Sequence, residues 1–139
     1  MVEQALKPSL STAFAVATDG LGDLAEAGLA LAARAVELAG TMGKTADFVT
    51  IAVTTTKEGT SVVSSSENAL RPAVSAALKE GEVAVKGAGH AEVTGVNAAK
   101  QMGLTPTGVA ASRGICPSCA GFLRTAGVAA LSALKGILP

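Results

Sequence analysis

The first long run of apolar positions covers Leu21–Leu38, where leucine, valine and alanine recur and charged residues are spaced apart. This pattern favours an α-helix, and Gly40 provides a residue that ends it. The preceding segment, Ser9–Gly20, is expected to be a shorter helix or an ordered lead-in. The chain therefore divides into an N-terminal lead-in, residues 1–20, and a single domain, residues 21–139.

A different pattern follows, in which β-branched residues predominate. The segment Phe48–Thr56 has the sequence "FVTIAVTTT", which predicts a β-strand. Lys57–Thr60 contains the residue types of a tight turn, and Ser61–Ser66 provides a second strand. Together these three segments predict a β-hairpin.

After the hairpin, segments typical of helices and strands alternate. In chain order we expect a helix at Asn68–Gly81 with Pro72 in its first turn, a short strand or extended linker at Glu82–Gly89, a helix at Ala91–Met102, a strand at Thr107–Ser112, a helix at Pro117–Thr125, and a last strand or helix at Val128–Leu134. Strands separated by a helix pair most naturally in parallel, through a crossover. The predicted fold class is α/β: a mixed β-sheet, with an antiparallel hairpin and then parallel strands, flanked by helices.

The composition narrows the kind of core that these elements can form. Hydrophobic residues make up 49% of the 139 residues, yet there is no tryptophan or tyrosine and there are three phenylalanines. This length is sufficient for a buried core that needs no disulfide bonds. A core of alanine, valine and leucine implies closely packed helices over a valine-rich sheet. It excludes a disordered chain, which would be poor in these residues and rich in charge.

The formal net charge is zero, but the charges are unevenly distributed. Residues 1–47 contain six acidic and three basic residues, whereas four basic residues and no acidic ones follow Glu92. A basic second half suits a site that is approached by a phosphate-bearing ligand such as nucleic acid. Because the region after Glu92 contains four charged residues in all, a chance distribution of charge is the alternative interpretation.

Two further features bear on the location of the chain. The apolar segment Leu10–Gly40 contains five charged residues and is not expected to span a membrane, and Met1–Leu10 lacks the pattern of a signal peptide. The two cysteines, Cys116 and Cys119, are too close in sequence to hold a fold together. They indicate metal binding or redox chemistry in a reducing compartment, and hence a cytoplasmic location.

The reactive side chains are concentrated in Gly89–Phe122, which contains the single histidine and both cysteines. His90, Cys116 and Cys119 offer three nitrogen and sulfur ligands, the number that a catalytic zinc site uses while its fourth position stays open. The cysteines, spaced i and i+3, fall on one face of a helical turn whose N-terminus favours thiolates. His90 likewise lies at the start of its predicted helix.

Glu92 adds an acid–base group to this set. It lies in the same first helical turn as His90, close enough to reach the open position of a metal without being a ligand. A carboxylate there can take a proton from a water molecule and hand it to a leaving amine. The order His-x-Glu followed by a Cys-x-x-Cys pair is close to the signature of zinc nucleobase deaminases.

The sequences "HAE" at His90–Glu92 and "CPSC" at Cys116–Cys119, separated by 23 residues, closely resemble the cytidine-deaminase superfamily. The short chain and its small residues are most similar to the deaminase domains of bacterial polymorphic toxins. The resemblance covers the chain from Phe48 onward. It implies that a Zn²⁺ ion is held by His90, Cys116 and Cys119, and that Glu92 is the proton shuttle.

The resemblance also implies a substrate and partners. The expected reaction is hydrolytic conversion of cytosine to uracil in nucleic acid, with DNA preferred and a single strand as the target, because opening a duplex costs energy. A toxin-type domain implies an immunity protein as partner and delivery into a target cell. Asn68 stands where many members of the superfamily place a sugar-binding asparagine, and Ala91 and Cys116 would lend backbone groups near the base.

Other substrate contacts are inferred from residue types near the motifs. Phe122 is the aromatic residue nearest to the cysteines, and Phe48 is a more distant candidate for stacking on a base. Arg113 is a candidate phosphate contact, with a solvated loop charge as the alternative. The chain departs from the family pattern because Pro117 lies between the cysteines and Ile115 precedes them. It also ends about one strand after the cysteine helix.

Three alternatives to a nucleic-acid deaminase remain open. A deaminase of free cytidine or nucleotides would not bind oligonucleotides in a salt-sensitive way. A non-catalytic zinc-binding interaction module would keep its function when Glu92 is replaced by alanine. A redox pair or a structural zinc site is the third, although a redox pair needs neither His90 nor Glu92, and no second Cys-x-x-Cys completes a four-cysteine site.

Overall fold

The computed structural model describes residues 20–133, so the lead-in predicted for residues 1–20 lies outside the described residues except for Gly20. The elements are, in chain order, α1 (Gly20–Gly40), the 3-10 helix η1 (Gly43–Asp47), β2 (Ile51–Thr56), β3 (Ser61–Ser65), α2 (Pro72–Ala76), β4 (Glu82–Ala84), α3 (Ala91–Gln101), β5 (Pro106–Ala111), α4 (Pro117–Ala126) and β6 (Ala129–Ala130). This succession agrees with the one predicted from the sequence. The last element, left open between strand and helix, is a strand.

The strands form a mixed sheet in the order β4-β3-β2-β5-β6. The central strand β2 is antiparallel to both of its neighbours, β3 and β5. The outer pairs, β3 with β4 and β5 with β6, are parallel, and each pair is joined through a helix as the crossover rule predicts. The α/β fold class is therefore confirmed and is consistent with a cytidine-deaminase-like fold. The start of β2 and the C-terminal ends of the other strands lie at the same end of the sheet.

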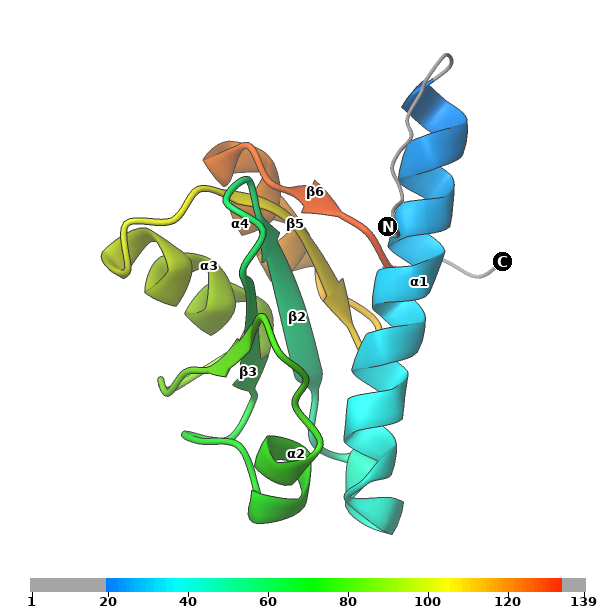
Figure 1. Cartoon of the computed structure of the whole chain (residues 1–139), viewed down its shortest axis with the longest axis vertical. Helices are drawn as coiled ribbons and strands as arrows, with labels where there is room; N and C mark the ends of the chain where they lie inside the picture. Colours follow the sequence, from blue (N-terminus) through cyan, green and yellow to red (C-terminus); the bar gives the residue numbers. More distant parts are fainter. Residues whose placement is uncertain (1–19, 134–139) are drawn as a thin grey trace.

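Helices cover both faces of this sheet (Figure 1). One buried cluster lies between the sheet and helices α1 and α2, and its members are Ala35, Leu38, Ala39, Ile51, Val53, Val63 and Val74. The other lies beneath α3 and α4, and its members are Ala52, Ala91, Val96, Val109, Ala111, Ile115, Cys119, Leu123 and Val128. Successive residues of β2 belong to opposite clusters, as the two-residue period of a strand requires. The core consists of small aliphatic residues, as the composition predicted.

Two boundaries differ from the sequence prediction for local reasons. The helix predicted at Asn68–Gly81 is reduced to α2, because Arg71 precedes a proline and is extended (φ −68°, ψ 153°). Its predicted end is instead a turn, in which the amide of Glu82 donates to the carbonyl of Lys79 (3.0 Å). The strand predicted from Phe48 begins at Ile51, because Phe48 has helical backbone angles at the end of η1.

Helix α1 is tied to the edge of the sheet by a largely buried ion pair. The Arg34 guanidinium donates to both carboxylate oxygens of Glu82 (2.7 and 2.9 Å) and to the carbonyl of Ala77 (2.8 Å). The hydrogen bond raises the pKa of Arg34 and lowers the pKa of Glu82. Each side chain is 12% exposed, so this pair is shielded from solvent. None of the helices in the described part of the chain is long and apolar enough to cross a lipid bilayer.

Candidate metal centre

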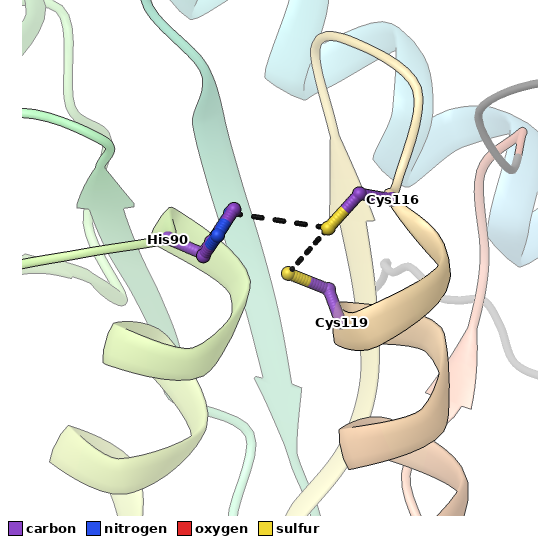
Figure 2. Close-up of side chains that lie close together, drawn as sticks. All are labelled: His90, Cys116 and Cys119. Carbon is purple, nitrogen blue, oxygen red and sulfur yellow. Dashed lines mark hydrogen bonds between the residues drawn. The ribbon is translucent and has the colours of Figure 1, made fainter.

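The three predicted metal ligands come together from the N-termini of two helices. His90 is the N-cap of α3 and Cys116 is the N-cap of α4, both with extended backbone angles. Pro117 occupies the first turn of α4, where its missing N–H leaves no helical hydrogen bond unmade. Cys119 follows on the same turn. Figure 2 shows the histidine ring and the two sulfurs pointing toward one another across the gap between α3 and α4.

The distances within this group fit a single metal ion. The two sulfurs are 3.2 Å apart, Cys116 Sγ lies 3.9 Å from His90 Nδ1, and all the ligand atoms lie within 4.8 Å of one another. A tetrahedral zinc with bonds of about 2.0 Å to nitrogen and 2.3 Å to sulfur would separate these ligand atoms by roughly 3.5–3.8 Å. One imidazole nitrogen and two sulfurs are also a donor set that zinc prefers. The three side chains can therefore hold one metal ion, and they are compatible with zinc.

The two thiols differ in acidity because their surroundings differ. Hydrogen bonds from the Ser118 hydroxyl and with Cys119 lower the pKa of Cys116. Burial raises the pKa of Cys119 to about 12, since its side chain is 1% exposed. A ligating cysteine must be deprotonated, so metal binding here has to displace the proton of a buried thiol. Metal affinity is therefore expected to increase with pH.

Glu92 lies near the ligands without belonging to their group. It is the second residue of α3 and is 4% exposed. Its negative charge raises the pKa of both Cys116 and Cys119, although it is a smaller influence than burial or hydrogen bonding. The ligand atoms that converge in the described residues are those of the histidine and the two cysteines. Glu92 is therefore close enough to affect the two thiols electrostatically, although it is not one of the converging ligands.

A pocket of about 190 Å³ opens beside the exposed His90 and the half-buried Cys116, and its lining residues are Thr50, His90, Arg113, Gly114 and Cys116. The pocket lies at the end of the sheet where β2 begins and β5 ends. The guanidinium of Arg113 donates to the carbonyl of Phe48 (3.3 Å), which holds this cation at the pocket rim. The sequence singled out Arg113 and His90 here. The sequence gave no role to Thr50, because the local pattern does not distinguish it from the other residues of the predicted strand.

The predicted substrate contacts Phe122, Asn68 and Ala91 are not among the residues that line this pocket. Phe122 is half-buried and packs against the core cluster beneath α4. Asn68 is exposed, and its carbonyl accepts a hydrogen bond from Gly87 N (2.9 Å). Ala91 is buried, and its carbonyl accepts a hydrogen bond from Ser64 Oγ (2.7 Å). These contacts make Asn68 and Ala91 supports for the segment that carries His90.

The contact of Ser64 with Ala91 reveals a positioning residue that the sequence did not single out. Ser64 is fully buried in β3, and its hydroxyl fixes the first turn of α3, which carries His90 and Glu92. Farther along the helix, a Cβ added to Gly95 would lie 2.5 Å from Thr54 Oγ1 and 3.0 Å from Ser64 Oγ. The absence of a side chain at Gly95 therefore lets α3 approach the sheet.

Comparison with protein-family models, with curated proteins and with solved structures finds no match for this chain. The chain has a mixed α/β sheet flanked by helices and a His-Cys-Cys group near enough to bind a metal, a combination loosely compatible with a zinc deaminase.

Proposed function

We propose that this chain is a zinc-dependent hydrolytic deaminase that converts cytosine to uracil in nucleic acid. The observation that carries the proposal is the convergence of His90, Cys116 and Cys119, with the buried Glu92 on the same helical turn as the histidine. A redox pair would need neither His90 nor Glu92. A structural zinc site would bring a fourth protein ligand, whereas the converging ligands in the described residues number three.

Zinc held by His90, Cys116 and Cys119 would supply Lewis-acid chemistry, which makes water a nucleophile at neutral pH. Glu92 is assigned the proton transfers. Its carboxylate takes a proton from the attacking water and delivers it to the ring nitrogen of cytosine, and a second transfer lets ammonia leave. Cytosine and water thus give uracil and ammonia. Burial of Glu92 keeps bulk water from competing for these protons.

Two observations favour nucleic acid as the substrate class. No acidic residue follows Glu92 in the sequence, so the half of the chain that contains the cysteines is basic. Arg113 also places a cation on the lining of the pocket. Cations of this kind contact phosphates. We propose a bacterial toxin-type domain, acting on DNA and on single strands in particular, with an immunity protein as its partner.

The test is a direct assay of deamination with the zinc-loaded protein. Single-stranded DNA, duplex DNA and RNA are analysed by sequencing, and cytidine and dCMP by mass spectrometry. Glu92→Gln removes the proton carrier, and Glu80→Gln is the matched control because Glu80 is an exposed glutamate outside the site. We expect the wild-type protein to convert cytosine to uracil in a polymer. Glu92→Gln should lower the rate of conversion by at least about 100-fold, and Glu80→Gln should leave this rate unchanged.

Other outcomes would redirect the assignment. Conversion of the small molecules alone would make the protein a deaminase of free nucleosides or nucleotides. If one zinc binds per chain but no substrate is converted, the deaminase proposal is wrong and a non-catalytic zinc-binding module takes its place.

A further inference from the structure

One exposed aromatic residue, Phe48, lies two positions before Thr50, which lines the pocket at the candidate metal centre. Phe48 is 78% exposed, the highest value among the large hydrophobic residues in the range 28–133. The chain has three phenylalanines and no tyrosine or tryptophan. Exposure of a single aliphatic residue is common in proteins. An exposed aromatic residue is a different matter here, because stacking surfaces are scarce in this chain.

The backbone of Phe48 contacts a cation that lines this pocket. Arg113 lines the pocket, and its Nη1 atom donates to the carbonyl of Phe48 (3.3 Å). Thr50, two residues after Phe48, also lines the pocket. The segments that carry Phe48 and Arg113 therefore meet at the pocket mouth, although they lie 65 residues apart in sequence.

Both segments are held firmly in place. Ser112 N donates to the carbonyl of Ile51 (2.8 Å), and Ile51 N donates to Ser112 Oγ (2.9 Å). On the other side, the amides of Phe48 and Val49 both donate to the carbonyl of Thr45 (2.9 and 3.0 Å). A ring on such a backbone loses little freedom when a ligand covers it, which favours binding.

An exposed ring with a neighbouring guanidinium matches the chemistry of a single-stranded nucleotide. Bases stack on aromatic faces, and a guanidinium binds the phosphate that links two nucleotides. The pocket itself would hold the base that reacts. We propose that Phe48 and Arg113 form a flanking subsite, which binds the nucleotide next to the target and makes a single strand, not a free nucleoside, the preferred substrate.

The flanking subsite, Phe48 with Arg113, rests on the proposed function in the sense that it serves the same pocket. Its binding can nevertheless be measured without turnover. Because the chain has no tryptophan or tyrosine, Phe48→Trp introduces the single indole of the protein. Met102→Trp is the matched control, since Met102 is also exposed (47%) but lies at the far end of α3 from His90.

The first experiment titrates an oligonucleotide of single-stranded DNA or RNA into each zinc-loaded tryptophan variant, with Glu92→Gln added to prevent conversion. We expect saturable quenching of the indole at position 48, weakened by salt, and none at position 102. Equal quenching at both positions, or none at either, would overturn the flanking subsite. The exposed Phe48 would then be assigned to contact with a protein partner.

The second experiment compares kcat/KM for an oligonucleotide and for cytidine. Replacing the ring with Phe48→Ser should lower the value for the oligonucleotide by roughly 5- to 150-fold, the cost of one lost stacked base, and leave the value for cytidine unchanged. Arg113→Gln should also lower the value for the oligonucleotide. Arg124→Gln, which replaces an exposed arginine on α4, should change neither value.

The two proposals fail in different ways. Equal losses on both substrates with Phe48→Ser would overturn the flanking subsite while the deaminase assignment stands. If the wild-type protein converts no substrate, the deaminase assignment fails, and the quenching at position 48 still decides whether the subsite binds a strand.

Discussion

At the scale of single residues, the two cysteines of the metal centre have unequal chemistry. Cys116 is half-buried at a helix N-cap, and the Ser118 hydroxyl lowers its pKa. Cys119 is buried, and its pKa is raised to about 12. Without a metal, Cys116 therefore carries the more available thiolate of the pair.

This difference predicts the order of alkylation in the metal-free protein. The thiolate is the reactive form, so at pH 7–8 iodoacetamide should modify Cys116 at least about tenfold faster than Cys119. Raising the pH should speed modification of Cys119 throughout the accessible range, because its pKa lies near 12. Fragment-ion mass spectrometry separates the two sites. Zinc should protect both thiols, and faster modification of Cys119 would contradict the assigned acidities.

At the scale of elements, the position of α3 depends on the missing side chain at Gly95. A Cβ there would lie 2.5 Å from Thr54 Oγ1, a buried hydroxyl, so Gly95→Ala has to push the helix away from the sheet. We expect a loss of about 1–3 kcal/mol in the free energy of unfolding, measured with urea, together with weaker zinc binding because His90 moves with α3.

The matched control is Gly121→Ala on α4. A Cβ at Gly121 would meet a single atom within 4 Å, the end of the Arg124 side chain at 3.9 Å. Alanine has the higher helix propensity, so this variant should be neutral or more stable by up to ~1 kcal/mol, with zinc binding unchanged. A Gly95→Ala protein as stable as the Gly121→Ala protein would show that α3 does not need the close approach.

The ion pair between α1 and β4 gives a second prediction at this scale. Its hydrogen bond with Arg34 lowers the folded-state pKa of Glu82 below the unfolded value of about 4.3, so the pair stabilises the protein above that pH. This contribution is lost as the pH falls through the lowered pKa. Glu82→Gln should therefore cost about 1–3 kcal/mol at pH 7 and progressively less below pH ~4, in urea unfolding.

The control for this pH dependence is Glu67→Gln, which removes an exposed pair with Arg71. Exposed pairs contribute little to stability, so its unfolding curve should stay close to wild type at every pH. A Glu82→Gln variant whose deficit grows on acidification would have the wrong sign for a carboxylate stabilised in its charged form.

The elements also show which parts of the fold can be predicted from local sequence. Pro117 at the start of α4 and the turn at Lys57–Thr60 are short-range signals, and both were interpreted correctly. The length of α2 was not, because Pro72 marks a helix start but does not fix its end. The rotation of α4, which turns Phe122 toward the core cluster, depends on packing partners that are remote in sequence.

At the scale of the whole molecule, the metal would cross-link two helices. His90 begins α3 and the cysteines begin α4, so one ion joins elements that are otherwise connected through β5. A ligand that binds the folded state alone adds to its stability, by about 2.7 kcal/mol at a free concentration of 100 times Kd. Zinc removal with a chelator should therefore lower Tm.

His90→Ala is the control for this metal effect, since it removes the exposed ligand without opening the core. Its Tm should lie near that of the zinc-free wild type and should not respond to the chelator in calorimetry. An undiminished response of His90→Ala would place the stabilising metal elsewhere in the chain.

The candidate metal ligands were predicted from sequence because their spacing places each near a helix start, whereas the pocket rim was predicted only in part. Thr50 lines it because β2 is central and antiparallel to β5, a pairing that no local pattern specifies. A residue before β2 thereby becomes a neighbour of a residue after β5.

That central strand also has a consequence for the order of folding. Its pairing with β3 closes a short loop, with Ile51 opposite Ser65, whereas its pairing with β5 brings Ala52 opposite Ala111 and closes a much longer one. Loop-closure entropy favours the short connection first. The hairpin should therefore gain amide protection before β5 in pulse-labelled hydrogen exchange. The metal ligands, on helices at either end of β5, would converge last, so zinc would meet a chain that is already largely folded.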